Sequence, residues 1–358
     1  MMSWLLVVLA VAVLLLLEKY WLPAASKALK CENGCSSMMA QPGETVLWRA
    51  RVENESRLSI PFVRLVQRFP AEAQVQEDPK WVRLHCNQGI HQWYLEEKMS
   101  VAARRSCTRT VRLRFDRRGE YTLGNYQISA GDLLGFREEE RTGDGKKLVI
   151  IPQRARNQKI LDALGGFLGD VSVRRFILED PVLTVGFRDY TGREPMKSIS
   201  WTRTASAGTL QVKQYDHTAE QTVTILLNVE GGTPEELEGC FSLARTACEQ
   251  LEKRKIPFGL RTNGNLPGPV GNIFTLAEGL GSRHTQTLLY ALGRADATCY
   301  YSFRYLVRQT LHHRRKQESY IVITPNLTEQ TQSDLRKLER AVGSGLCVLT
   351  GSEEVAQG

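Results

Sequence analysis

The N-terminal half of the chain alternates apolar and polar positions with a period of two. Val46, Trp48, Ala50 and Val52 recur in this way, which predicts a strand with one apolar face. The cleanest such pattern lies over 111–115. Apolar runs predict further strands over 60–69, around 93–95, after the turn at 117–120, and over 147–152. Short strands separated by turns are typical of an antiparallel β-sandwich, here expected over 43–152.

The C-terminal part, 218–358, alternates predicted strands with predicted helices. Thr233, Pro234 and Glu236 form a capping box that starts a helix. The order of elements predicts an α/β domain with a mainly parallel sheet and helices on both faces. Strands are expected over 222–228, 256–261, 320–324 and 346–349, and the later helices over 282–294, 301–317 and 328–342. Residues 153–185 are expected to be a connector with helical or irregular character.

The N-terminus carries a long apolar run, Met2–Leu17, interrupted by Ser3 alone. Sixteen helical residues span roughly 24 Å, and Tyr20 to Leu22 extend the helix into the membrane interface. We therefore predict a transmembrane anchor over 1–22 and a linker over 23–42. A cleavable signal peptide is the alternative, although such peptides normally begin with a cationic segment. Because the lysines follow the run, the soluble domains are expected in the cytoplasm at the cell membrane.

Charge and cysteine content narrow the function classes only in part. The 358 residues carry a net charge of +8, which suits nucleic acid, an anionic membrane surface or an acidic partner. The eight cysteines include no C-x-x-C pair, and Cys31 and Cys35 lack a second pair at zinc spacing. We therefore expect reduced cysteines, no structural zinc and no cofactor.

The segment 186–217 is dense in aromatic and cationic side chains, with Gly192 and Gly208 as predicted turns. Two interpretations are open. The apolar residues form a core strip, or the segment is a binding surface, since Tyr, Trp and Arg are enriched at binding hot spots. The strip would be Phe187, Ile199, Trp201, Leu210 and Val212. The partner surface would be Arg188, Tyr190, Lys197, Trp201, Arg203 and Lys213.

This segment resembles the signature of a bacterial family, the domain of unknown function fifty-eight. The family pattern is G-F-R-x-Y-x-x-G-D, a basic residue, I-x-W, T-A and L-x-V-K-Q. Here it is matched by Gly186–Arg188, Tyr190, Gly192, Lys197, Ile199, Trp201, Thr204–Ala205 and Leu210–Gln214. The sequence departs from the pattern after Tyr190, where one residue instead of two precedes Gly192, and Arg193-Glu194-Pro195 follows Gly192 without the aspartate. The family's R-G-x-Y-x-L-G and D-x-x-G are matched by Arg118–Gly119, Tyr121, Leu123–Gly124, Asp132 and Gly135.

The resemblance implies that the C-terminal domain is von Willebrand A-like. Such domains bind a divalent metal through D-x-S-x-S after their first strand, and oxygen ligands of this kind suit a hard cation. Here Asn228 stands at the aspartate, both serines are absent, and Glu230 is the nearest carboxylate. No metal is expected. The resemblance also implies a partner, a MoxR-type AAA+ ATPase, with transglutaminase-like membrane proteins as further associates of the family.

Other features of the chain point to no reaction. No P-loop, G-x-S-x-G or H-E-x-x-H motif occurs, so an enzyme is unsupported. The arginines of 104–118 form either the charged outer face of a sheet or a membrane-surface contact, and the latter would use Arg104, Arg105, Arg112 and Arg114. No nucleic-acid recognition motif is present.

These observations predict a membrane-tethered, non-catalytic interaction or assembly factor. The alternative is a metal-dependent adhesion-type domain or an uncharacterised enzyme.

The anchor prediction is tested by fractionation. Full-length protein should stay in membranes after a carbonate wash, and protease added outside intact cells should spare the soluble body. A mature form that starts near Ala28 and is free in the medium would identify the apolar run as a signal peptide instead.

Overall fold

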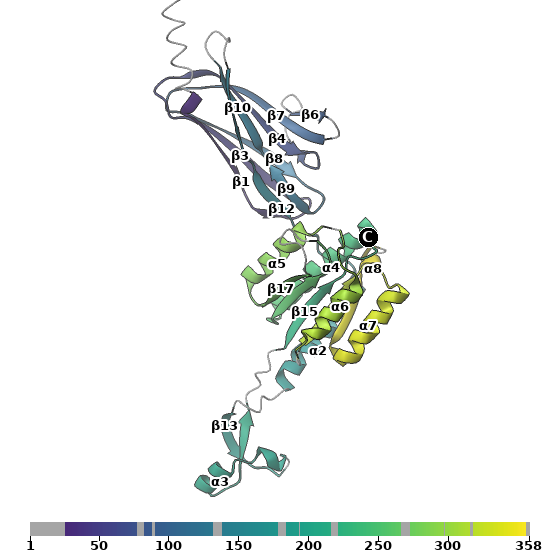
Figure 1. Ribbon diagram of the computed structural model, residues 1–358. Helices are drawn as coiled ribbons and strands as arrows, with labels where there is room; N and C mark the ends of the chain where they lie inside the picture. The colour runs from purple at the N-terminus through teal and green to yellow at the C-terminus, as the bar shows by residue number, and fades with distance from the viewer. Residues whose placement is uncertain are drawn as a thin grey trace, which may run out of the picture. The chain divides into compact units, whose positions relative to one another are not determined.

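The structure is a computed structural model with two compact units that divide after Pro152 (Figure 1). It describes residues 26–76, 82–87, 90–131, 138–177, 184–192, 194–215, 221–265, 273–296, 298–315 and 318–355. The predicted anchor lies outside these residues, as do Asp132 and Gly135. Within the described part of the chain, no helix is both long and apolar enough to cross a membrane.

The first unit is an antiparallel β-sandwich-like domain, which confirms the expectation for this half of the chain. One sheet has the strand order β1-β3-β8-β5 and the other β11-β10-β4-β7-β6, while β2, β12 and β9 form a smaller third sheet. The strands are β1 Leu29–Cys35, β2 Met39–Ala40, β3 Thr45–Asn54, β4 Ile60–Pro70, β5 Gln74–Val75, β6 Val82–Asn87, β7 Ile90–Val101, β8 Ser106–Arg114, β9 Gly119–Leu123, β10 Asn125–Gly131, β11 Glu138–Gly143 and β12 Lys146–Ile150.

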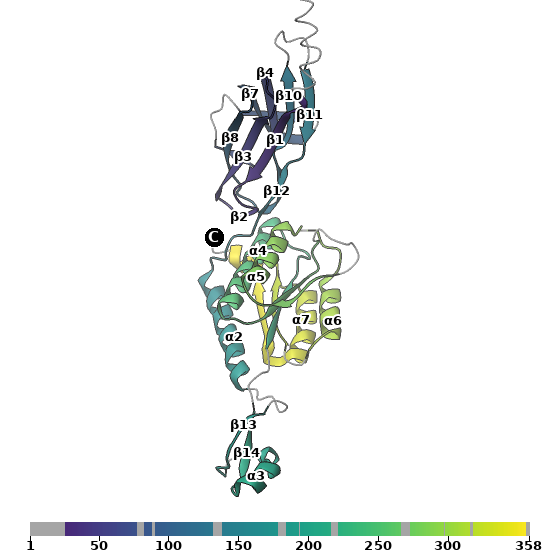
Figure 2. The same ribbon diagram turned by 90° about the vertical axis from the view of Figure 1, so that its left-hand side faces the viewer.

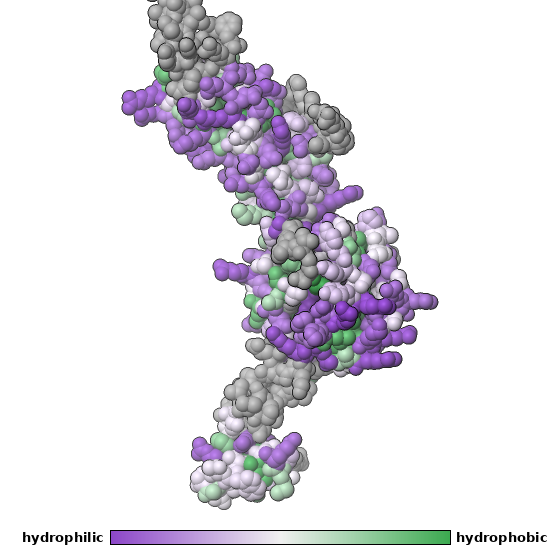
Figure 3. Space-filling model, viewed as in Figure 1, coloured by the Kyte–Doolittle hydropathy of each residue, from purple (hydrophilic) through white to green (hydrophobic). Residues whose placement is uncertain are grey.

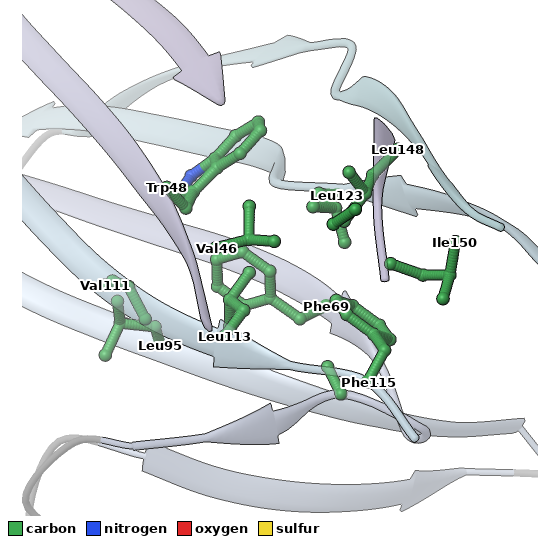
Figure 4. Packing of buried hydrophobic residues seen from close by; sticks show 12 residues of the cluster. Val46, Trp48, Phe69, Leu95, Val111, Leu113, Phe115, Leu123, Leu148 and Ile150 are labelled. Carbon is green, nitrogen blue, oxygen red and sulfur yellow. The ribbon is translucent and has the colours of Figure 1, made fainter. Parts of the chain in front are cut away.

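The core of this domain lies on the faces that the period-two pattern predicts. The four apolar residues of β3 named above are all buried, and Trp48 is fully so. Its ring meets Phe69 of β4 edge-on, with 6.0 Å between the ring centroids. Figure 4 shows Trp48 among apolar side chains from β3, β4, β8, β9 and β12. An indole buried in this way contributes a large apolar area to the core.

The predicted linker over 23–42 instead contains two strands. β1 pairs with β3 from Leu29 opposite Asn54 to Cys35 opposite Trp48, and β2 pairs in parallel with β12. The sequence of β1, LKCENGC, has no apolar alternation, and Leu29 alone in it is buried. Backbone pairing with a neighbouring strand therefore makes this segment a strand, and a local apolar pattern does not reveal it.

The second unit contains the α/β domain, whose sheet has the order β17-β16-β15-β18-β19. All pairings are parallel except that of β16 with β17, which confirms the mainly parallel sheet. Helices α4 and α5 cover one face of the sheet and α6 and α7 the other (Figure 2). The elements are β15 Thr222–Leu227, α4 Pro234–Lys253, β16 Phe258–Thr262, β17 Phe274–Gly279, α5 Ser282–Arg294, α6 Phe303–His312, β18 Glu318–Thr324, α7 Glu329–Val342, η2 Gly343–Gly345, β19 Leu346–Thr350 and α8 Gly351–Val355.

Capping residues set several helix boundaries as the sequence predicts. The Thr233 hydroxyl accepts from the Glu236 N–H, and the Glu236 carboxylate accepts from the Thr233 N–H, which completes the capping box of α4. The Thr328 hydroxyl caps α7 by accepting from the Thr331 N–H, without the reciprocal bond of a capping box. The last predicted helix but one is shorter than expected, since α6 begins after its N-cap Ser302 and ends at His312.

The connector over 153–185 contains a 20-residue helix, α2 Gln158–Ile177. Its start is held by the C-terminal helix α8. The Glu354 carboxylate accepts from the backbone N–H groups of Arg156 and Asn157, and the Asn157 amide donates to the Glu353 carbonyl at 3.0 Å. These bonds hold the residues that precede α2 against α8, and the Asn157 side chain caps α2 by accepting from the Lys159 N–H at 3.1 Å.

A glycine beside Trp48 tests the packing of the β-domain. Gly124 and Gly43 both have left-handed backbones, with φ of +66° and +82°. A Cβ at Gly124 would lie 2.0 Å from the Trp48 ring, whereas one at Gly43 meets its nearest atom, on Arg114, at 3.5 Å. Gly43→Ala should cost about 1–2 kcal/mol for backbone strain alone. Gly124→Ala should cost about 1–3 kcal/mol more because the core must shift.

Urea denaturation of both variants measures this difference. Equal free energies of unfolding for the two variants would show that the Trp48 ring can move aside with no loss of stability.

Candidate functional site

The signature segment folds as a small hairpin module, defined here as residues 184–215. Strand β13 Thr184–Asp189 pairs with β14 Gln211–Tyr215, with Phe187 opposite Lys213 and Arg188 opposite Val212. Between them lie a 3₁₀ turn, η1 Met196–Ser198, and a short helix, α3 Trp201–Ala207. Gly208 ends α3 in the left-handed conformation with φ of 70°, as its predicted turn role requires.

Few apolar side chains of this module are buried. Ile199 and Val212 form a β-bridge and are 6% and 2% exposed. Trp201, Leu210 and Phe187 of the expected core strip are instead exposed, at 62%, 42% and 39%. The core-strip interpretation therefore holds for two of its five residues. Trp201 is exposed because it opens α3 rather than lying in a strand of the hairpin.

Cationic side chains accompany these exposed apolar groups. Arg188, Lys197, Arg203 and Lys213 are all exposed, and Tyr190 is half-buried, so the structure places the predicted surface residues on one small module. The Arg203 guanidinium lies 5.0 Å from the centre of the Phe187 ring, a cation–π contact. Figure 3 shows hydrophobic and hydrophilic residues side by side on the module surface.

Polar contacts hold the turn of the module. The Arg188 guanidinium donates to Glu194 at 2.7 Å, and the Thr191 hydroxyl donates to the same carboxylate, also at 2.7 Å. The hydrogen bonds from Thr191, with further help from Arg188, lower the pKa of Glu194 to about 2. Glu194 therefore stays ionised at neutral pH and fixes the position of Arg188.

The α/β sheet has a second candidate site where its strand order reverses. Ligands of open α/β sheets bind outside the carboxyl ends of the strands at such a switch point, here between β15 and β18. The side chain of Asn228 lies there, directly after β15. It donates to the Thr324 hydroxyl at 3.0 Å and accepts from the Asn263 amide at 2.8 Å. Asn263 also accepts from the Val229 N–H and donates to the Tyr301 carbonyl.

The carboxylates near this edge are also engaged. Glu230 accepts from the Phe303 N–H at 2.6 Å, at the start of α6. Asp334, which is buried, lies 2.7 Å from the Lys337 ammonium and 3.5 Å from the Arg304 guanidinium. Among the described residues, no three His, Cys, Asp or Glu side chains are grouped to hold a metal ion. The side chain of Asn228 is thus part of a closed polar network.

The arginines of the β-domain lie on exposed positions. Arg112 and Arg114 alternate with buried Val111 and Leu113 along β8, so they occupy the outer face of their sheet. Arg104 and Arg105 lie in the turn before β8, where Arg104 has a φ of 54°. Arg109 differs, since it is half-buried and pairs with Glu97 of the opposite sheet at 2.6 Å. This arrangement fits both a charged outer face and a membrane contact.

Burial keeps several of the described thiols protonated. Burial raises the thiol pKa of Cys31 and Cys347 to about 11 and that of Cys240 to about 12, and it raises that of Cys248 further. A protonated, buried thiol is unreactive. His284 is engaged with the Phe258 carbonyl at 2.7 Å. His217 lies outside the described residues.

The chain matches no family model and no curated protein. Among solved structures it is similar to AvmM, described as catalysing macrocyclization in alchivemycin A biosynthesis (13% identity, TM-score 0.23, 34% of this chain and 88% of that one). It is also similar to a CARDB domain from Pyrococcus furiosus in complex with di-metal ions (11%, 0.22, 34% and 89%). A third likeness is to a non-cellulosomal cohesin from Archaeoglobus fulgidus (15%, 0.22, 34% and 91%). Each match spans about a third of this chain, and none of the three assigns it a function.

The engaged oxygens at the sheet edge generate a prediction about metal. Millimolar Mg²⁺ or Mn²⁺ should leave the thermal unfolding midpoint unchanged, because binding would first have to break the Asn228 network. A site with Kd of ~10 μM would add about 2.7 kcal/mol at 1 mM free ion. A rise of this size that disappears in Glu230→Ala, each protein being compared with and without metal, would overturn the prediction.

Proposed function

We propose that this protein is a membrane-tethered, non-catalytic interaction or assembly factor whose hairpin module docks on a partner protein. The observation that carries the proposal is the composition of the module surface. Four large apolar side chains are exposed on it: Phe187, Met196, Trp201 and Leu210. Surface apolar groups scattered singly need no explanation, but four on so small a module mark an interaction site.

The charge of the module favours an acidic partner surface. Lys197 and Lys213 have no ion-pair partner among the residues the structure describes, whereas Arg188 is paired with Glu194. Exposed lysines beside an exposed Trp and Phe give the apolar centre and charged rim that protein interfaces share. The resemblance to the domain of unknown function fifty-eight supports a MoxR-type AAA+ ATPase as the partner, and a von Willebrand A-like role for the α/β domain.

The α/β domain supports a binding role rather than a catalytic one. Its switch-point edge is closed by the amides of Asn228 and Asn263. Burial keeps the thiols of Cys240, Cys248 and Cys347 in this domain protonated. The tether itself rests on the apolar run at 2–17, which precedes the described residues.

The proposal predicts that surface substitutions in the module weaken partner binding without affecting folding, whereas a core substitution prevents folding. Lys213→Glu and Arg203→Glu should leave the fold intact, because exposed substitutions usually change stability by less than about 0.5 kcal/mol. Both should reduce co-purification of a MoxR-type ATPase from solubilised membranes, because they reverse the charge complementarity. Val212→Asp, next to Lys213, should unfold the module, since it buries an unpaired charge.

Circular dichroism and co-purification on each variant provide the measurement. The control is Arg336→Glu, which reverses an exposed charge on α7 and should retain the partner. If Lys213→Glu and Arg203→Glu fold and still retain the partner, the module is not the docking surface.

A further inference from the structure

A cleft of about 500 Å³ lies in the α/β domain between α6 and the strands β16 and β17. It opens on the sheet face that α6 and α7 cover, and it is separate from the closed Asn228 network. Its volume falls in the range of small-molecule sites. Ile273 and Leu306 give it apolar walls, while Thr275, Gln309 and Thr310 add polar groups.

Arg261 of β16 is one of the charged residues that line this cleft. Its side chain is half-buried, and it has no hydrogen-bond or ion-pair partner among the residues that the structure describes. A cation that is partly shielded from water and has no ion pair is less favourable than a paired one. A guanidinium in this position presents its planar fork of donors to whatever enters the cleft.

A second arginine lies at the rim and is restrained by an acid. The Arg315 guanidinium donates to Glu278 of β17 at 2.6 Å, and both residues line the cleft. The Arg315 side chain is 73% exposed, so it can turn toward a ligand while its backbone N–H stays bonded to Glu318 at 3.2 Å. Among the described residues that line it, the cleft therefore offers Arg261 without an ion pair and Arg315, which Glu278 partly neutralises.

We propose that this cleft binds a small molecule that carries one oxyanion group, a phosphate or a carboxylate, on an apolar body. The oxyanion pairs with Arg261, since an arginine fork matches both groups in a bidentate manner. The apolar body packs against Ile273 and Leu306. Gln309, whose amide already donates to the Tyr305 hydroxyl at 3.1 Å, retains a second N–H for the ligand. This site is independent of the hairpin module and of its partner.

The test uses the full-length protein in a nonionic detergent, at constant ionic strength. Calorimetric titration with phenyl phosphate, benzoate and inorganic phosphate distinguishes the oxyanion types and the role of the apolar body. Saturable binding of phenyl phosphate or benzoate is expected, tighter than that of inorganic phosphate. Arg261→Gln should weaken it at least tenfold, whereas the control Arg336→Gln on α7 should leave it unchanged.

A second variant shifts the affinity in the opposite direction. Glu278→Gln removes the acid that restrains Arg315 and should tighten binding severalfold, while Glu339→Gln, on exposed α7, should not. This arm also decides the matter if Arg261→Gln does not fold. The proposal fails if neither aromatic anion binds saturably with a Kd below about 10 mM. It also fails if the control substitutions change the affinity as much as the cleft substitutions do.

Discussion

The pairing of β13 with β14 is the constraint on which the candidate docking surface depends. It buries Val212 against Ile199, and few other apolar contacts hold the module. The hairpin ladder and the Thr191–Glu194–Arg188 contacts also hold the module, and they leave Trp201 and Met196 exposed.

At the switch point of the α/β sheet, the side chain after β15 is the amide of Asn228, whose hydrogen-bonding capacity differs from that of an aspartate. An aspartate only accepts hydrogen bonds when ionised, so its oxygens seek a cation. Asn228 both donates to Thr324 and accepts from Asn263, which closes the network within the protein. Through these two hydrogen bonds Asn228 joins the ends of β15, β16 and β18. The Arg261 cleft lies apart from this network, on a face of the same sheet.

The sequence predicts a helix or strand wherever the buried residues of that element recur with a regular spacing. The apolar face of β3 and the capping box at Thr233 are both local patterns, and the structure has them where expected. Two strands are not predicted from local patterns. β1 lacks an apolar alternation, and the antiparallel edge strand β17 has only half-buried and exposed positions. The candidate site divides in the same way. Composition identifies the module, but the exposure of Trp201 and the isolation of Arg261 depend on tertiary neighbours that no local pattern encodes.

The cationic side chains of the chain lie in two different environments, exposed to solvent or half-buried in a cleft. Exposed lysines such as Lys213 act through solvent, where salt screens interactions beyond about 8 Å, so they contribute to recognition only at close contact with a large acidic surface. Arg261 lies half-buried in a cleft, where the effective dielectric is lower and a single oxyanion is attracted more strongly. The module therefore suits a macromolecule and the cleft suits a small anion. Arg261 lies in β16, and Asn263 directly after this strand donates a hydrogen bond to Asn228 at the end of β15. An anion bound to Arg261 would therefore contact the same strand that Asn263 joins to β15.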